Sequence, residues 1–113
     1  MEPVKTYTAQ IFVGLQEGYD GPTHSISVVY GVCATYVEEV KLCVTVTPTS
    51  FFYVGDEEPG AIVGLISYPR FPTTEEEIRA KAFVLAQRLK AKLRQLRVTI
   101  VFTDRTVTLG EKE

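Results

Sequence analysis

The stretch TTEEEIRAKAFVLAQRLKAKLRQ, Thr73 to Gln95, decides the fold expected for this chain. Its apolar residues recur every three or four positions, the pattern of a helix that packs by one face. Thr73 or Thr74 offers an N-cap, and the glutamates that follow place negative charge in the first turn, where it complements the helix dipole. We therefore predict a long helix here. Its buried stripe is Ile78, Ala82, Leu85, Leu89, Leu93 and Leu96.

Two strands are expected before this helix. Residues 42 to 54, LCVTVTPTSFFYV, alternate between apolar and polar side chains, and Pro48 indicates an edge position or a bulge because proline cannot donate to a ladder. GDEEPG, residues 55 to 60, reads as a hairpin loop that leads into a third strand, Ala61 to Tyr68. The pair therefore predicts a β-hairpin directly before the helix.

The N-terminal part predicts a first strand and a first helix. Residues 6 to 15 alternate, with Ala9, Ile11 and Val13 on one side. Residues 25 to 39 are ambiguous, since β-branched side chains favour a strand while the apolar spacing is helical. We choose a helix, with Thr23 or Ser25 as its N-cap.

The chain ends in RVTIVFTDRTVTL, which predicts a fourth strand with a short hairpin at Thr103–Asp104–Arg105. The order is then β-α-β-β-α-β. With right-handed crossovers this order predicts an α+β, ferredoxin-like sandwich: a four-stranded antiparallel sheet with two helices on one face. No linker interrupts it, so residues 1 to 113 are expected to form a single domain.

Composition narrows the class of protein. An apolar share of 45% and a charged share of 23% are ordinary for a globular protein, and no apolar run is long enough to span a bilayer. The N-terminus lacks the pattern of a secretory signal, so we expect a cytoplasmic protein. Cys33 and Cys43 lack metal spacing and are both expected to be buried thiols, and neither a metal nor a cofactor is expected.

Basic side chains gather on the long helix and just after it. From Ile78 to Thr103 the chain carries basic residues and no acidic one, although its formal net charge is −2. A solvated helix whose cations complement its dipole explains this better than a nucleic-acid surface, because interleaved aromatics and RNA-binding motifs are missing. Nucleic acid is therefore not an expected partner.

The second face of the predicted sheet is expected to be covered. Phe12 and Val101, with the aromatic run from Phe51 to Tyr53, would form a larger apolar patch than a monomer normally exposes. We predict a homo-oligomer that assembles through this face or through strand edges.

A candidate binding site arises where two loops lead into helix N-termini, which attract anions. If the first and third strands are adjacent and parallel, Gln16–Ser25 and Tyr68–Thr74 lie side by side. Arg70 would hold a phosphate or carboxylate with its planar fork, unless it turns back to Glu75–Glu77. The proposed ligand-binding residues are Tyr19, His24, Ser25, Tyr68, Arg70, Thr73 and Thr74.

Catalytic motifs for phosphate binding, hydrolysis or metal-assisted chemistry are absent from the sequence. His24 is the one histidine and lies beside a predicted helix start, where a local hydrogen-bonding role is the commoner one. No catalytic residue is assigned.

The segments EGYDGPTHS, KLCVTVTPTSFFYV and EEPGAIVGLISYPRFPTTEEEIR resemble small uncharacterised proteins of bacteriophages and prophages. The resemblance implies a phage setting, in which small proteins often act by occupancy, and brings no functional residues with it.

Three functions stay open. The main expectation is a non-enzymatic homo-oligomer that captures a small anionic, nucleotide-like ligand. The first alternative is a protein-interaction module that inhibits a host protein. The second is a small dimeric ferredoxin-like enzyme that works in a cleft with few polar residues.

Overall fold

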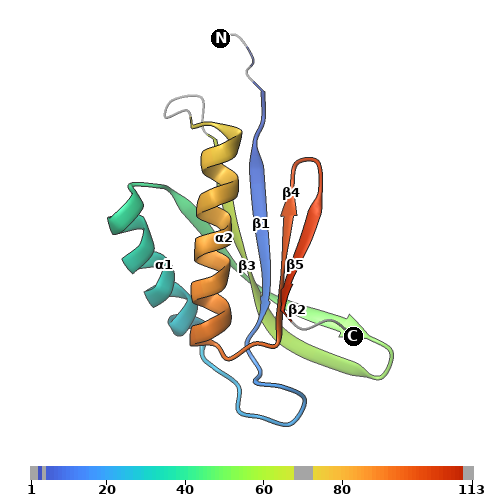
Figure 1. The fold of residues 1–113 in the computed structure, drawn as a ribbon. Coiled ribbons are helices and arrows are strands. Elements are labelled where there is room, and N and C mark those ends of the chain that lie inside the picture. Colours follow the sequence, from blue (N-terminus) through green and yellow to red (C-terminus); the bar gives the residue numbers. More distant parts are fainter. Residues whose placement is uncertain (1–2, 4, 68–72, 111–113) are drawn as a thin grey trace.

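The computed structural model describes residues 3, 5–67 and 73–110. Within them, two helices lie on one face of a five-stranded sheet (Figure 1). The elements are β1 (Thr8–Gly14), α1 (Ile26–Val40), β2 (Val44–Tyr53), β3 (Asp56–Ile66), α2 (Glu75–Lys92), β4 (Arg97–Phe102) and β5 (Thr106–Gly110).

The sheet has the order β2-β3-β1-β4-β5, and every neighbouring pair is antiparallel. The α+β class is confirmed, but the predicted count of four strands is wrong. The chain turns at Thr103–Arg105, and β5 then pairs with β4 from Arg97↔Gly110 to Val101↔Thr106. The expected short hairpin thus supplies a fifth strand. β2 is an edge strand, which accommodates Pro48 as predicted.

The expectation that the first and third strands run parallel is wrong. β1 pairs antiparallel with β3, with Thr8 opposite Ile66 and Gly14 opposite Gly60. The reason is the β2–β3 hairpin, which reverses the chain between the two strands. The loop after β1 and the start of α2 therefore lie at opposite ends of the sheet (Figure 1), so Thr73 and Thr74 do not meet the Gln16–Ser25 loop.

The core lies between the sheet and the two helices. Because side chains alternate along a strand, Ala9, Ile11 and Val13 of β1 face the helices and are buried. α1 buries Val29, Cys33 and Tyr36, which confirms the helical interpretation of its ambiguous sequence. The predicted stripe of α2 is buried from Ile78 to Leu93, whereas Leu96 lies beyond the helix and is 47% exposed.

The β2–β3 hairpin is longer than the sequence predicts. Its turn is only Val54 and Gly55, and Asp56–Gly60, expected as loop, belong to β3. Gly55 has φ +76°, a left-handed conformation that suits glycine. The hairpin extends beyond the layer of helices (Figure 1), and it leaves Phe52 73% exposed.

No helix in the described part of the chain is both long and apolar enough to cross a membrane.

Candidate functional site

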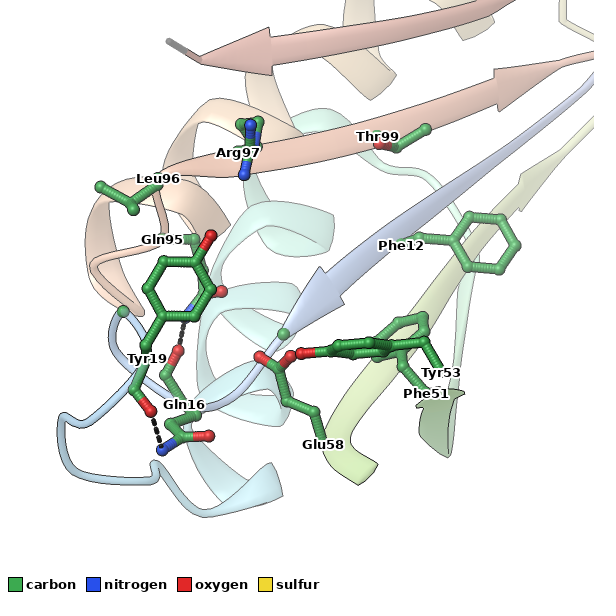
Figure 2. A pocket seen from close by; sticks show the side chains of 12 residues that line it. Phe12, Gln16, Tyr19, Phe51, Tyr53, Glu58, Gln95, Leu96, Arg97 and Thr99 are labelled. Carbon is green, nitrogen blue, oxygen red and sulfur yellow. Dashed lines mark hydrogen bonds between the residues drawn. The ribbon is translucent and has the colours of Figure 1, made fainter. Parts of the chain in front are cut away.

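A pocket of about 430 Å³ lies on the sheet face that the helices do not cover, near the end of β1 (Figure 2). Its volume falls in the usual range for small-molecule sites, about 300–1,000 Å³. It is lined by Phe12, Gly14, Gln16, Gly18, Tyr19, Phe51, Tyr53, Glu58, Gln95, Leu96, Arg97 and Thr99.

Strand register brings distant residues into this pocket. Phe12 of β1 lies opposite Thr99 of β4, and Phe51 of β2 lies opposite Glu58 of β3. Residues on the covered face are buried in the core, so these alternate positions point the other way. The open face therefore presents aromatic rings and a carboxylate at one end of the sheet.

The aromatic wall is fixed by the hairpin. Phe51 lies against Gly60, where a Cβ would fall 2.1 Å from its ring, so a side chain at position 60 would displace the ring. Tyr53 donates to Asp56, and this hydrogen bond is the main cause that raises the pKa of Tyr53, with smaller contributions from the charges of Glu58 and Tyr19. Glu58 and Tyr19 therefore lie close enough to Tyr53 for their charges to act on its hydroxyl.

The loop after β1 forms the opposite wall. Glu17 N–H donates to Pro22 O, and His24 N–H donates to Leu15 O, so the loop folds back on itself. The side-chain amide of Gln16 donates to Tyr19 O at 3.1 Å and points toward Gly21 O at 3.4 Å. This bonding holds Tyr19 at the mouth of the pocket (Figure 2), where the residue is 78% exposed.

Gln95 joins this loop to the end of α2. Its Nε2 donates to Gln16 O at 2.9 Å and to Leu93 O at 3.0 Å. Arg94 adopts a left-handed conformation, φ +53°, just after the helix, and this reversal turns the following residue toward the sheet. Side chains from β1, its loop and the end of α2 therefore meet at one corner.

The structure separates most of the predicted site residues. Tyr19 lines the pocket, but His24 pairs with Glu17 at 2.7 Å, and Ser25 caps α1 by accepting from Ser27 N–H. Thr74 caps α2 by accepting from Glu77 N–H.

Thr73, beside that cap, donates to the Glu77 carboxylate. Tyr68 and Arg70 lie outside the described residues.

The sequence prediction misses the central pocket residues. Glu58 appears there as part of a solvated hairpin tip, and Gln95 as the end of a helix. Neither belongs to a local motif, because their meeting depends on the pairing of β3 with β1. Phe12 was assigned to the open face by alternation, and Phe51 and Tyr53 were assigned there as part of an aromatic run, of which Phe52 does not line the pocket.

A second hollow lies between α1 and α2, with a volume of about 720 Å³. Its lining is mostly small and apolar, with Val28, Gly31 and Val32 on one side. The guanidinium of Arg88, which borders this hollow, pairs with Glu39 and lies over the Tyr36 ring, 4.9 Å from the ring centroid. These contacts give Arg88 a structural role. The open-face pocket is the better candidate because more of its lining is polar than that of the hollow between the helices.

The described residues contain no cluster of histidine, cysteine and acidic side chains that would hold a metal ion.

Comparison with known proteins finds no matching family model and no curated relative. Two solved structures share the fold. A phage SAM lyase in its apo state has a TM-score of 0.79 and 21% identity, covering 100% of this chain and 97% of the other. A phage SAM lyase in complex with S-methyl-5′-thioadenosine has a TM-score of 0.75 and 18% identity, covering 98% and 95%. Both neighbours are phage proteins, which agrees with the resemblance to phage proteins seen in the sequence.

These neighbours correct the main functional prediction. The prediction of a non-enzymatic protein that captures an anionic ligand is contradicted by these two neighbours, because both are SAM lyases. The finding favours the alternative of a small enzyme with few polar residues in its cleft.

Proposed function

We propose that this chain is a lyase that cleaves S-adenosylmethionine and releases S-methyl-5′-thioadenosine. The observation that carries the proposal is Glu58, a carboxylate placed among the aromatic rings of the open-face pocket, in a fold shared with phage SAM lyases. A substrate that combines a purine with positive charge matches such a lining.

The aromatic side chains suit both the purine and the positively charged sulfonium of S-adenosylmethionine. Phe12, Phe51 and Tyr53 offer ring faces on which a purine stacks. Ring faces also attract a cation, by about 0.5–2 kcal/mol depending on how far water is excluded. Glu58 adds negative charge beside these rings, which complements the positive charge of the sulfonium.

The reaction needs little acid–base machinery. A lyase breaks the bond from sulfur to the γ-carbon of the methionyl chain without adding water, and the bonding electron pair stays on sulfur. An oxygen of the α-carboxylate in the same methionyl chain donates an electron pair to the γ-carbon. The new C–O bond closes a five-membered lactone ring. Opposite charges are neutralised in this step, so a pocket that excludes water favours it. The side chains that line the pocket include one carboxylate, Glu58, and no histidine.

Exclusion of water leads us to retain the homo-oligomer as a proposal. Tyr53 is 52% exposed and Val54, at the hairpin turn, is wholly exposed. A second copy packed on the open face would cover these side chains and close the pocket. Native mass spectrometry measures the number of subunits, and a monomer alone would contradict this part of the proposal.

The fold itself is proposed to be a ferredoxin-like sandwich extended by β5. Support comes from the order β-α-β-β-α-β and from the strand order β2-β3-β1-β4 that precedes the added strand.

The deciding experiment incubates the purified protein with S-adenosylmethionine and follows S-methyl-5′-thioadenosine by liquid chromatography and mass spectrometry. We expect product with the wild type and a loss of at least about 100-fold in Glu58→Gln, which keeps the shape but removes the charge. Glu57→Gln is the matched control, since Glu57 is the neighbouring strand residue on the other face and is exposed.

Labelled water separates a lyase from a hydrolase. In H₂¹⁸O, direct attack of water at the γ-carbon would place the label in the γ-hydroxyl of homoserine, whereas a lyase leaves that oxygen unlabelled. The proposal fails if the folded wild type forms no S-methyl-5′-thioadenosine, or if Glu57→Gln loses activity as fully as Glu58→Gln.

A further inference from the structure

Two acceptor oxygens from distant segments meet over Gly14, the last residue of β1. A Cβ built on Gly14 would lie 2.8 Å from Gln95 Oε1 and 3.3 Å from Glu58 Oε1. The absence of a side chain at Gly14 is what gives these oxygens room beside the strand. Glu58 and Gln95 both border the pocket at this corner (Figure 2).

The orientation of the Gln95 amide follows from its contacts. Its nitrogen faces the carbonyl oxygens of Gln16 and Leu93, at 2.9 Å and 3.0 Å. Carbonyls only accept hydrogen bonds, so the NH₂ group must lie on their side and Oε1 on the other. The same contacts that anchor the loop therefore aim the amide oxygen over Gly14.

Neither oxygen is used within the described part of the chain. The hydrogen bonds and ion pairs of those residues give Glu58 no partner, and Gln95 Oε1 receives no donor. The side chain of Gln95 is nevertheless held at two points, so the cost of ordering it is already met before a ligand binds. A ligand group with two neighbouring donors would satisfy both oxygens at once.

We propose that Glu58 and Gln95 accept the 2′- and 3′-hydroxyls of a ribose, which makes Gln95 the residue that selects ribonucleosides; this inference rests on the proposed function. A vicinal diol supplies two adjacent donors, and a carboxylate is a common partner for ribose hydroxyls in nucleotide-binding proteins. The glycine lets the sugar approach the strand backbone closely. The aromatic wall leaves the purine to stack beside this corner.

Binding of unreactive nucleosides tests the pair. Calorimetry compares adenosine, 2′,3′-dideoxyadenosine and purine riboside, which keeps the ribose but lacks the adenine amino group. We expect the wild type to bind adenosine at least about tenfold more tightly than the dideoxy compound, since loss of the hydroxyls leaves both acceptors unpaired. Purine riboside is expected to show the same dependence on Gln95 as adenosine.

Three variants locate the effect. Gln95→Leu removes one acceptor, and Gly14→Ala crowds both oxygens. Each variant is therefore expected to bind adenosine and 2′,3′-dideoxyadenosine with nearly equal affinity. Gln87→Leu, on an exposed part of α2, is the control that leaves the preference unchanged. Circular dichroism and melting curves check that each variant folds. If Gly14→Ala does not fold, Gln95→Leu still decides the question.

The outcomes separate the two proposals. If the folded wild type binds no nucleoside and does not cleave S-adenosylmethionine, the proposed function fails and the inference with it. If cleavage is present but the wild type binds adenosine and dideoxyadenosine equally, the inference alone is wrong. It is also wrong if Gln95→Leu keeps the full preference for adenosine over dideoxyadenosine. The same holds if Gln95→Leu weakens binding of adenosine but not of purine riboside, which lacks the adenine amino group.

Discussion

The hydroxyl of Tyr53 donates a 2.9 Å hydrogen bond to Oδ2 of Asp56, joining the two residues that flank the turn of the β2–β3 hairpin. Asp56 Oδ1 also accepts from Glu57 N–H, at 2.8 Å. The carboxylate thus holds both sides of a two-residue turn. Because Tyr53 also borders the pocket, this contact relates hairpin geometry to the aromatic wall.

The first prediction concerns the pKa of Tyr53. Asp56 raises this pKa because its carboxylate stabilises the neutral phenol as a donor and repels the tyrosinate. Asp56→Asn is therefore expected to lower the pKa of Tyr53 toward its ordinary value, as measured by NMR of ¹³Cζ-labelled tyrosine assigned with Tyr53→Phe. Glu57→Gln is the control. An unchanged titration in Asp56→Asn would show that the hydrogen bond is not the main cause.

The second prediction tests the packing of α2 on the sheet. Leu85 is fully buried, so Leu85→Ala should reduce the free energy of unfolding by about 2–5 kcal/mol through lost burial and a cavity. Val84, the preceding residue, is 40% exposed, and Val84→Ala is expected to cost under about 1 kcal/mol. Urea denaturation followed by circular dichroism gives both values. Equal losses would contradict the assigned face of the helix.

The third prediction concerns Thr74, which the sequence offered as a ligand-binding residue. Its Oγ1 accepts from Glu77 N–H at 3.1 Å, so Thr74→Ala should reduce the free energy of unfolding by about 0.5–2 kcal/mol. Thr74→Asp keeps an acceptor at the cap and should recover most of that loss in urea denaturation. Neither variant is expected to alter nucleoside binding, because Thr74 lies at the end of the sheet opposite the pocket. A selective loss of binding in Thr74→Ala would restore it as a site residue.

The fourth prediction separates the two cysteines. Burial raises the pKa of Cys33 to about 11, so at pH 8 its thiol is protonated as well as shielded. Cys43 is exposed. Iodoacetamide at pH 8 should therefore modify Cys43 in the native protein and reach Cys33 only after unfolding in urea, as intact-mass measurements would show. Rapid double modification under native conditions would mean that the α1 side of the core opens readily.

The periodicity of the chain predicted its elements well. The 3.6-residue repeat of α2 and the alternation of β1 report which side chains are buried, and burial is a local consequence of amphipathic spacing. The caps of both helices were also predictable, because Ser25 and Thr74 act on backbone groups two or three residues away.

The strand directions were the main error. The sequence identifies a hairpin between β2 and β3, and the reversal that this hairpin imposes makes β3 antiparallel to β1, and not parallel to it as was predicted. The predicted site depended on that parallel arrangement, because it joined the loop after β1 to the loop before α2. The fifth strand was missed as a separate element because its pairing with β4 follows a turn of only a few residues.

The sequence by itself determined the buried stripes, the helix caps and the open face that carries Phe12, because each depends on residues a few positions apart. The tertiary structure alone decided that Gly14, Glu58 and Gln95 meet at one corner. That meeting follows from antiparallel pairing of β1 with β3 and from the reversal after α2, which join residues 14, 58 and 95 across the chain. Pairing between strands distant in sequence leaves no local pattern, and so the pocket became visible only in the folded protein.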